Sequence, residues 1–303
     1  MRILITGSNG MLGSDLVEQL RGQFEIAGLG LNENRHSSIP FFKADLGKKS
    51  AVSQAVNTFR PAIIVHAAAY TDVDGCESHP HQVYLINTKG TQYLAEASDR
   101  TGATLIFISS DYVFDGEKNS PYLETDSTGP ISVYGQSKFE AEEWLKDHSN
   151  SVSIIRSSWL FGTAGRNFFR AILSRLKEGK SLSVVNDQRG APTYTLDLAE
   201  GIKSFIQCAA RPKGYEIYHL ANTGVTTWYD AAKKLVAKTG VQKEIKAITS
   251  AELNRPAKRP KNSVLNMTKI KSSYGIELRS WEEALDHFWE HVLRAEWQEM
   301  VKV

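Results

Sequence analysis

The chain has 303 residues, a length that suits one large domain or two modest domains better than a single small core. Hydrophobic residues make up 41% and charged residues 23%, a globular composition that excludes disorder of the whole chain. The 36 Lys and Arg residues against 34 Asp and Glu residues leave a net charge of +2. No global field therefore exists to recruit nucleic acid or an anionic membrane.

Cysteines and apolar segments indicate the compartment. Cys76 and Cys208 show no metal-ligand spacing and cannot form a disulfide framework, which suits a reducing environment. No window holds about 18 consecutive apolar residues, and residues 2–7 run into glycine-rich chain without space for an apolar signal segment. We expect a cytoplasmic protein with no bound metal, acting on a small molecule and not on a membrane or nucleic acid.

The first 160 residues alternate short apolar runs with helical patterns, which is typical of βαβ units. The helix after the first run is predicted at residues 14–22, with Leu16, Val17 and Leu20 on one face. The apolar runs, each too short for a helix, predict strands at residues 2–6, 24–29, 41–44, 62–65, 104–108 and 152–156. Six parallel strands predict a doubly wound α/β sheet of the Rossmann type.

Beyond residue 160 helical patterns dominate, at about residues 167–178, 195–208, 228–239 and 281–299. The last begins after Ser280, with Glu283 three positions on, which has the form of a capping box. Pro256 and Pro260 exclude a helix interior from residues 254–263, predicted as an ordered loop at an edge of a second lobe.

A glycine-rich turn lies between the first predicted strand and helix, with Gly7, Gly10 and Gly13. Glycines there permit a tight turn and close approach of a diphosphate to backbone N–H groups, beside the positive end of a helix. The spacing differs from that of ordinary dehydrogenases and resembles that of the extended short-chain dehydrogenase/reductase family. The turn therefore predicts a dinucleotide site.

Cofactor choice usually depends on an acid at the end of the second strand, which accepts from the ribose 2′-OH and repels a 2′-phosphate. Here Gly30, Leu31 and Asn32 hold no carboxylate before Glu33, and Arg35 follows. The pattern favours NADPH and leaves NADH open as a second cofactor. Further cofactor-binding residues implied by the resemblance are Met11, Leu12, Asp45, Leu46, Ala67, Ala68 and Ala69.

Tyr134 and Lys138 stand four positions apart, so on a helix both project from one face. An ammonium beside a phenol lowers the phenol pKa from about 10 toward neutrality, so we expect Tyr134 to exchange a proton near pH 7. Ser110, at the carboxyl end of the fifth predicted strand, lies where open α/β sheets place their sites. Together the three resemble the Ser/Thr-Tyr-Lys triad of the short-chain dehydrogenases.

Motifs along nearly the whole chain resemble those of the dTDP-4-dehydrorhamnose reductase family. They lie at residues 110–116, 122–126, 156–162, 186–193 and 259–263. One departure is Ser110, where relatives usually carry Thr, and the hydroxyl is retained. The substrate-binding residues that the resemblance implies are Val73, Ser110, Asp111, Tyr112, Trp159, Asn167, Arg189 and Arg259.

The resemblance implies NADPH-dependent reduction of the C4 keto group of dTDP-4-dehydro-L-rhamnose to dTDP-L-rhamnose, a precursor of cell-surface polysaccharide. Tyr134 would protonate the C4 oxygen, Ser110 would bind it, and Lys138 would hold the nicotinamide ribose. Trp159 would pack on the apolar sugar face, with Val73, Asp111 and Tyr112 around it, and Asn167, Arg189 and Arg259 would serve the diphosphate.

The implied domains are an NADP-binding Rossmann domain of residues 1–165, extended by about 185–222, and a smaller C-terminal α/β substrate domain of residues 166–184 and 223–303. Some relatives can dimerise around Mg²⁺ through an acidic residue at the place of Asp15. A homodimer and the use of Mg²⁺ both stay open.

Two other classes remain as alternatives. Dehydratases of this fold carry Thr-Asp-Glu at the end of strand five, whereas Tyr112 stands here at the Glu position, and epimerases hold NAD tightly, which the missing strand-two acid disfavours. A regulatory subunit such as the methionine adenosyltransferase β subunit binds a dinucleotide and a partner enzyme without catalysis. The intact triad favours catalysis.

Overall fold

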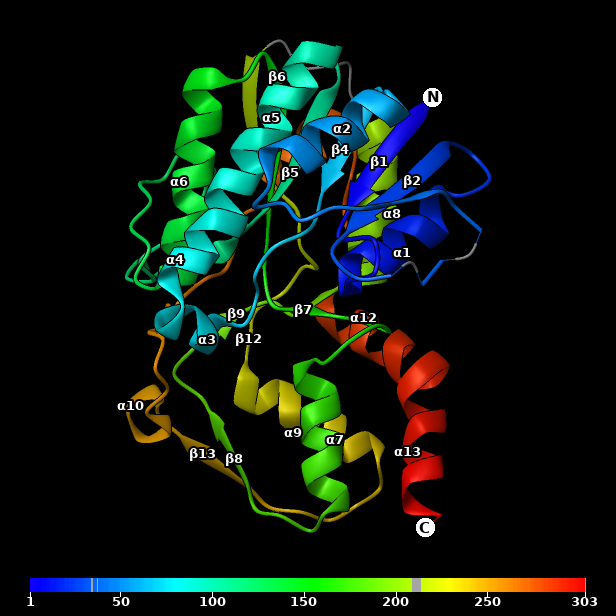
Figure 1. Ribbon diagram of the computed structural model, residues 1–303. Coiled ribbons are helices and arrows are strands. Elements are labelled where there is room, and N and C mark those ends of the chain that lie inside the picture. The colour runs from blue at the N-terminus through cyan, green and yellow to red at the C-terminus, as the bar shows by residue number, and fades with distance from the viewer. Residues whose placement is uncertain (34, 37, 209–213, 303) are drawn as a thin grey trace.

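The structure is a computed structural model that describes residues 1–33, 35–36, 38–208 and 214–302. A large lobe surrounds a parallel sheet, and a smaller, mainly helical lobe lies against the lower end of the large lobe (Figure 1). Within these residues no helix combines the length and apolarity needed to cross a bilayer.

The described residues of the large lobe form a seven-stranded sheet in the order β11-β6-β5-β4-β1-β2-β3, with every pairing parallel. The strands are β1 (Arg2–Thr6), β2 (Glu25–Gly30), β3 (Phe41–Lys43), β4 (Ile63–His66), β5 (Thr104–Ser110), β6 (Ser151–Ser157) and β11 (Gly214–His219). Strand order reverses between β1 and β4, the switch point at which such sheets bind ligands. The predicted doubly wound fold is confirmed.

The prediction missed β11, the edge strand beside β6. Its residues include Tyr215 and Glu216 and are half-exposed over the first part of the strand, so no continuous apolar run marks it. Buried parallel strands reveal themselves as apolar runs, whereas an edge strand with polar residues does not.

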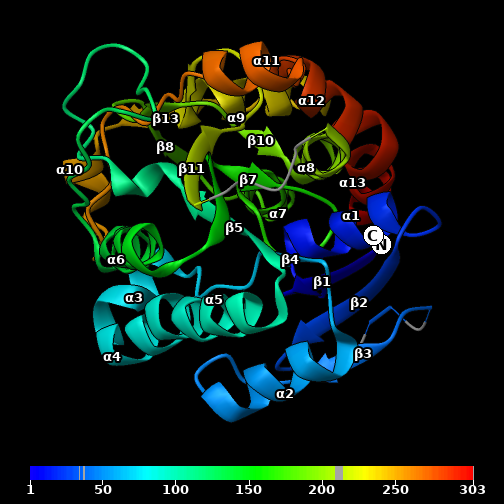
Figure 2. The same cartoon turned by 90° about the horizontal axis from the view of Figure 1, so that it is seen from above.

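Helices cover both faces of the sheet, as Figure 2 shows. On one face α1 (Met11–Leu20) and α8 (Thr195–Cys208) pack on Ile3 and Ile5 of β1. On the other, α2 (Lys49–Phe59), α5 (Gly90–Thr101) and α6 (Val133–His148) form a core with Leu4. Successive residues of β1 serve opposite cores because side chains alternate along a strand.

Short elements connect the sheet to its helices. They are α3 (Val73–Ser78), α4 (Pro80–Val83), a π-helical turn (Tyr84–Lys89), a 3₁₀ turn (Asp111–Val113), β7 (Leu160–Phe161), β9 (Arg189–Gly190), β10 (Thr193–Tyr194) and β12 (Thr226–Thr227). β7 pairs with β10 in parallel, and β9 pairs with β12 antiparallel.

The small lobe is built around β8 (Leu182–Val185), which pairs in parallel with β13 (Ile245–Ile248). Its helices are α7 (Phe168–Lys177), α9 (Trp228–Lys238), α10 (Ser250–Leu253), α12 (Trp281–Phe288), a π-helical turn (Trp289–Leu293) and α13 (Arg294–Val301). A further helix, α11 (Thr268–Tyr274), contributes Ile270 to the large-lobe core. The domain boundaries stated above stay a prediction.

Two local predictions in this region are confirmed. Ser280 and Glu283 form a reciprocal capping box at the start of α12. Asn254 ends α10 in the left-handed conformation, with φ of 47°, and residues 255–263 continue without a helix. The loop therefore leaves the small lobe in a defined direction, toward the large lobe.

Candidate active site

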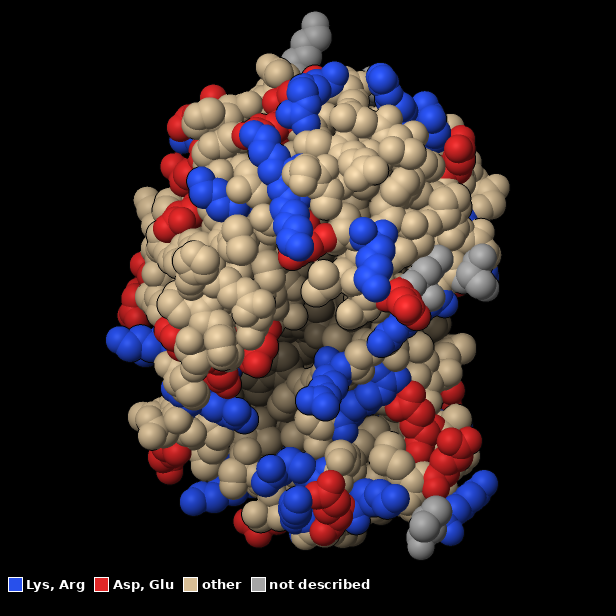
Figure 3. Space-filling view, in the orientation of Figure 1, with Lys and Arg blue, Asp and Glu red and all other residues tan. Residues whose placement is uncertain are grey.

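A cleft of about 630 Å³ lies between the two lobes, at the carboxyl ends of β1, β4, β5 and β6. Figure 3 shows the hollow, with Lys and Arg side chains gathered on its lower rim. Residues far apart in sequence meet here. The predicted site residues that line it are Gly7, Gly10, Met11, Leu12, Ala67, Ala68, Ala69, Val73, Ser110, Asp111, Tyr112, Tyr134, Lys138 and Trp159.

The glycine turn forms one wall of the cleft and has no space for side chains. A Cβ at Gly7, whose φ is +68°, would lie 2.8 Å from Ala68 Cα. A Cβ at Gly13 would lie 2.0 Å from the Gly7 carbonyl oxygen, so Gly13 serves helix packing rather than the cleft lining. Gly10 begins α1 without a side-chain cap, which leaves the helix N-terminus open to an anion. This wall fits a dinucleotide diphosphate.

Three further residues predicted to bind cofactor lie outside the cleft lining. Arg35 is exposed, and its backbone N–H donates to Asn9 Oδ1 at 3.0 Å, which ties its loop to the glycine turn. The Asp45 carboxylate accepts from the Gly47 N–H at 2.9 Å, and Leu46 is buried in the core. Their contacts with a cofactor stay predictions.

Ser110, Tyr134 and Lys138 converge at the inner end of the cleft. Ser132 caps α6 by accepting from the Gly135 N–H at 3.2 Å, and this starts the helix that carries Tyr134 and Lys138. All three side chains line this end of the cleft, and the Ser110 hydroxyl is close enough to the Tyr134 phenol to affect its pKa. The three side chains are therefore close together, as the spacing predicts.

Neighbouring groups hold the Ser110 hydroxyl and the Lys138 ammonium. Ser110 Oγ donates to Asp111 Oδ1 at 2.8 Å and accepts from the Tyr112 N–H at 3.2 Å. Lys138 Nζ donates to the Ile108 carbonyl at 2.7 Å and lies 4.0 Å from the centre of the Phe107 ring. Each group thus has a fixed position before any ligand enters.

Burial controls the electrostatics of the site. It lowers the pKa of Lys138 to about 7 and raises the pKa of Asp111 to about 6, because both charged forms are desolvated. Burial, with the Asp111 charge second, also raises the pKa of Tyr134. The expectation that Lys138 brings the Tyr134 pKa down toward neutrality is wrong for this structure. The Lys138 ammonium faces Ile108, and desolvation of the phenol dominates.

An aromatic wall forms the opposite side of the cleft. The Trp159 ring stacks on Trp228 with centroids 3.8 Å apart, and Phe168 lies 4.4 Å from Trp228. Gly190 makes room, since a Cβ there would lie 2.5 Å from the Trp159 ring. Trp228 and Phe168 also line the cleft. The sequence does not predict this, because both residues lie in the first turns of helices, where nothing in the local pattern marks them as site residues.

The residues predicted for the diphosphate do not line the cleft. Asn167 caps α7, accepting from the Arg170 N–H at 3.1 Å, and donates to the Gly162 carbonyl at 2.9 Å. Arg189 is exposed on β9, and its backbone pairs with Lys261. Arg259 donates to Asp74 Oδ1 at 3.0 Å. Arg166 lines the cleft instead.

Two buried polar residues support the loop after β4. Asn87 Oδ1 accepts from the Tyr70 N–H at 2.7 Å, and its amide donates to Ser137 Oγ at 3.0 Å. His66 lies between the hydroxyls of Thr6 and Thr91, at 2.7 and 3.0 Å. The sequence around each residue does not indicate these hydrogen bonds, because their partners come from segments far apart in the chain.

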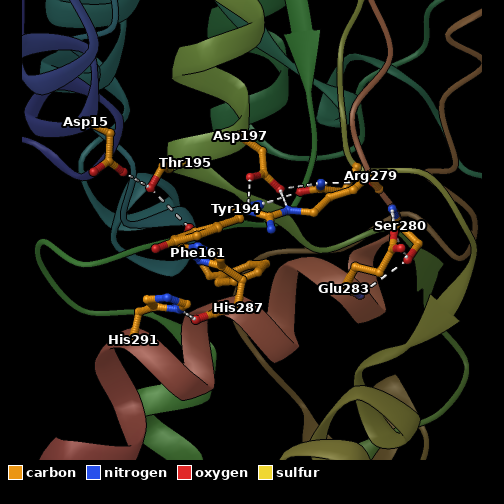
Figure 4. A network of polar contacts seen from close by, with 11 residues as sticks. Asp15, Phe161, Tyr194, Thr195, Asp197, Arg279, Ser280, Glu283, His287 and His291 are labelled. Atoms are coloured by element: carbon orange, nitrogen blue, oxygen red, sulfur yellow. Dashed lines mark hydrogen bonds and ion pairs between the residues drawn. The ribbon is translucent and has the colours of Figure 1, made fainter.

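Asp15, the residue associated with Mg²⁺, does not line the cleft and belongs to the polar network drawn in Figure 4. Its carboxylate accepts from Thr195 Oγ1 at 2.5 Å, and burial raises its pKa. Nearby, Asp197 is ion-paired with Arg279 and accepts from Asn222 Nδ2 at 2.8 Å. Within the described ranges no three His, Cys, Asp or Glu side chains cluster as metal ligands. The use of Mg²⁺ stays untested.

Comparison with known proteins adds independent information. The model of the RmlD substrate binding domain family matches residues 1–294. The chain is 38% identical to a dTDP-4-dehydrorhamnose reductase of Aggregatibacter actinomycetemcomitans over 94% of this chain and 97% of that protein. It is 36% identical to the spore coat polysaccharide biosynthesis protein SpsK of Bacillus subtilis, over 95% and 96%.

Solved structures agree. A dTDP-4-dehydrorhamnose reductase of Bacillus anthracis in complex with NADP is 35% identical, with a TM-score of 0.86 over 96% of this chain and 99% of that chain. A UDP-glucose 4-epimerase of Thermotoga maritima, 23% identical over 97% and 99%, has a TM-score of 0.85, which shows the shared fold alone. The glycine turn, the triad and the full-length match together place this chain in the RmlD substrate binding domain family.

Proposed function

We propose that this protein is an NADPH-dependent reductase that converts dTDP-4-dehydro-L-rhamnose to dTDP-L-rhamnose, for cell-surface polysaccharide synthesis. The observation that carries the proposal is the convergence of Ser110, Tyr134 and Lys138 in a cleft that also contains the glycine turn. Relatives at 34–38% identity over nearly the whole chain bear the name of that activity.

The glycine turn and the cleft floor fit a nicotinamide dinucleotide. Gly7, Gly10 and the open start of α1 suit its diphosphate, and Ala68 and Ala69 leave space beside the backbone. When bound, NADPH supplies the hydride that reaches C4 of the sugar. NADP in the Bacillus anthracis relative supports this choice of cofactor.

Tyr134 is suited to give a proton. Its phenol is protonated at neutral pH and lies in the cleft, where it is placed to donate to the C4 oxygen as negative charge develops there. Ser110, beside Tyr134 in the cleft, holds the same oxygen.

Lys138 and Trp159 orient the two reactants. Lys138, fixed on the Ile108 carbonyl, is placed to hold the nicotinamide ribose. The Trp159 ring, fixed by its stack on Trp228, presents an apolar face to the sugar. Homodimerisation and a cytoplasmic location are further parts of this proposal.

The test is oxidation of NADPH with a panel of 4-keto sugar nucleotides, with the configuration of the product determined. We expect turnover with dTDP-4-dehydro-L-rhamnose and formation of dTDP-L-rhamnose. Turnover with another 4-keto sugar alone would assign a different reductase. Absence of turnover with every substrate, together with capture of a methionine adenosyltransferase, would favour the regulatory-subunit alternative.

A further inference from the structure

Arg166 is the cation on the small-lobe wall of the cleft. Among the described residues that line the cleft, only Lys138 and Arg166 carry positive charge. Lys138 is buried at the inner end of the cleft, where it is already assigned to the nicotinamide ribose. Arg166 is exposed and has no ion pair with any described residue, so its guanidinium is available to a ligand.

The loop that carries Arg166 is held rigidly over the cleft. The guanidinium of Arg170 donates to the carbonyls of Gly162 and Thr163 at 2.9 and 2.7 Å. Arg170 is itself fixed by Glu296, with N–O distances of 2.9 and 2.6 Å. Arg170 therefore stabilises the loop, whereas the Arg166 guanidinium has no hydrogen bond or ion pair recorded with a described residue.

The loop also approaches the glycine turn. A Cβ at Gly162 would lie 1.9 Å from Thr195 Oγ1 and 3.1 Å from Met11 Cγ, so the loop backbone packs against the side chains that begin α8 and α1. The cleft thus has backbone N–H donors on one wall and a guanidinium on the other. A diphosphate matches this pair, since its two negative groups accept from both sides.

We propose that Arg166 binds a nucleotide diphosphate in the cleft, in place of Arg189 and Arg259. The shared chemistry comes from two sources, the NADPH diphosphate and the diphosphate of the sugar nucleotide. Binding of the sugar-nucleotide diphosphate rests on the proposed function, whereas binding of the NADPH diphosphate requires only a dinucleotide in the glycine turn.

The experiment measures binding of NADPH by fluorescence and of dTDP by calorimetry, for the wild type, Arg166→Gln and Arg166→Lys. Lys177→Gln is the matched control, because Lys177 is an exposed cation on α7 that does not line the cleft. We expect Arg166→Gln to weaken one ligand about 10- to 100-fold, as loss of charge-assisted hydrogen bonds does. Arg166→Lys should keep part of that affinity, and Lys177→Gln should keep all of it.

The two arms separate the sources. A loss confined to NADPH assigns Arg166 to the cofactor, and a loss confined to dTDP assigns it to the substrate. The proposal would be overturned if Arg166→Gln bound both ligands with wild-type affinity, or if Lys177→Gln lost as much affinity as Arg166→Gln. It would also be overturned if Arg166→Gln lost affinity for both ligands equally and had a lowered melting temperature. A wild type that binds NADPH but not dTDP contradicts the proposed function and leaves the NADPH arm as the test of Arg166.

Discussion

Asp74 of α3 accepts a hydrogen bond from the Arg259 guanidinium at 3.0 Å, joining residues 185 positions apart across the two lobes. The same carboxylate accepts from the Ala257 N–H at 3.3 Å. Burial raises the pKa of Tyr112, which lines the cleft, and the nearby Arg259 guanidinium partly offsets that rise. Asp74 therefore positions both the loop after α10 and one wall of the substrate end.

Asp74→Asn should raise KM for the sugar nucleotide about fivefold and leave kcat and NADPH affinity near wild type. The pair is partly exposed, so we take about 1 kcal/mol for it. Arg255→Gln is the control, because Arg255 touches the same carboxylate at 3.4 Å but is 57% exposed. Steady-state kinetics measure both constants. Equal KM values in the wild type and Asp74→Asn would mean that the Asp74–Arg259 pair stabilises the loop but does not affect substrate binding.

Tyr134→Phe should reduce the rate of sugar reduction about 10²- to 10⁴-fold, because the ring is kept and the proton donor is lost. The affinity for NADPH, measured by fluorescence, should stay at the wild-type value. A variant that reduces the sugar at nearly the wild-type rate would show that another group supplies the proton.

Trp159→Ala should raise KM for the sugar nucleotide by an amount equivalent to about 1–3 kcal/mol, because stacking and apolar burial are lost. Trp228→Ala should act in the same direction, since Trp228 fixes the Trp159 ring at 3.8 Å. In the double variant the free-energy loss calculated from KM should be smaller than the sum of the two single losses, because the stacked rings contact the sugar as one unit. An unchanged KM together with a lowered melting temperature would mean that Trp159 and Trp228 stabilise the fold and do not contact the substrate.

The wild type should show a higher kcat/KM with NADPH than with NADH. Arg35 lies on a loop tied to the glycine turn through Asn9, and no acid precedes Glu33. Charge-assisted hydrogen bonds to the 2′-phosphate are worth about 1.5–3 kcal/mol. Arg35→Glu should narrow or invert the ratio, whereas the same ratio in both proteins would mean that Arg35 points away from the cofactor.

Lys138 should make the cofactor-free protein more stable as pH rises from about 7 toward 10. Its folded pKa is lowered to about 7 by burial, while the unfolded chain keeps the proton up to its ordinary value of about 10.4. The gain is at most about 1.4 kcal/mol per pH unit in this window. Lys138→Met should flatten the dependence of Tm on pH, and Tyr134→Phe, which keeps Lys138, should not. Identical slopes in wild type and Lys138→Met would mean that folded Lys138 stays protonated.

Local pattern alone determined six of the seven described strands of the sheet, the glycine turn and the Tyr134–Lys138 pair. The alternation of Ile3, Leu4 and Ile5 between two cores, and the four-residue step from Tyr134 to Lys138, follow from backbone periodicity. These features need only neighbours in the chain, so a sequence displays them. The matching capping box at Ser280 has the same local origin.

Only the tertiary structure decided which residues face the cleft from the small lobe. Trp228 meets Trp159, and Arg166 rather than Arg189 or Arg259 lines the cleft, because loop directions depend on contacts between segments far apart in sequence. The direction of the Tyr134 pKa shift was likewise decided by burial, a property of the packed molecule. The sequence contains the charged and aromatic groups, but their solvent exposure and partners exist only once the two lobes have packed together.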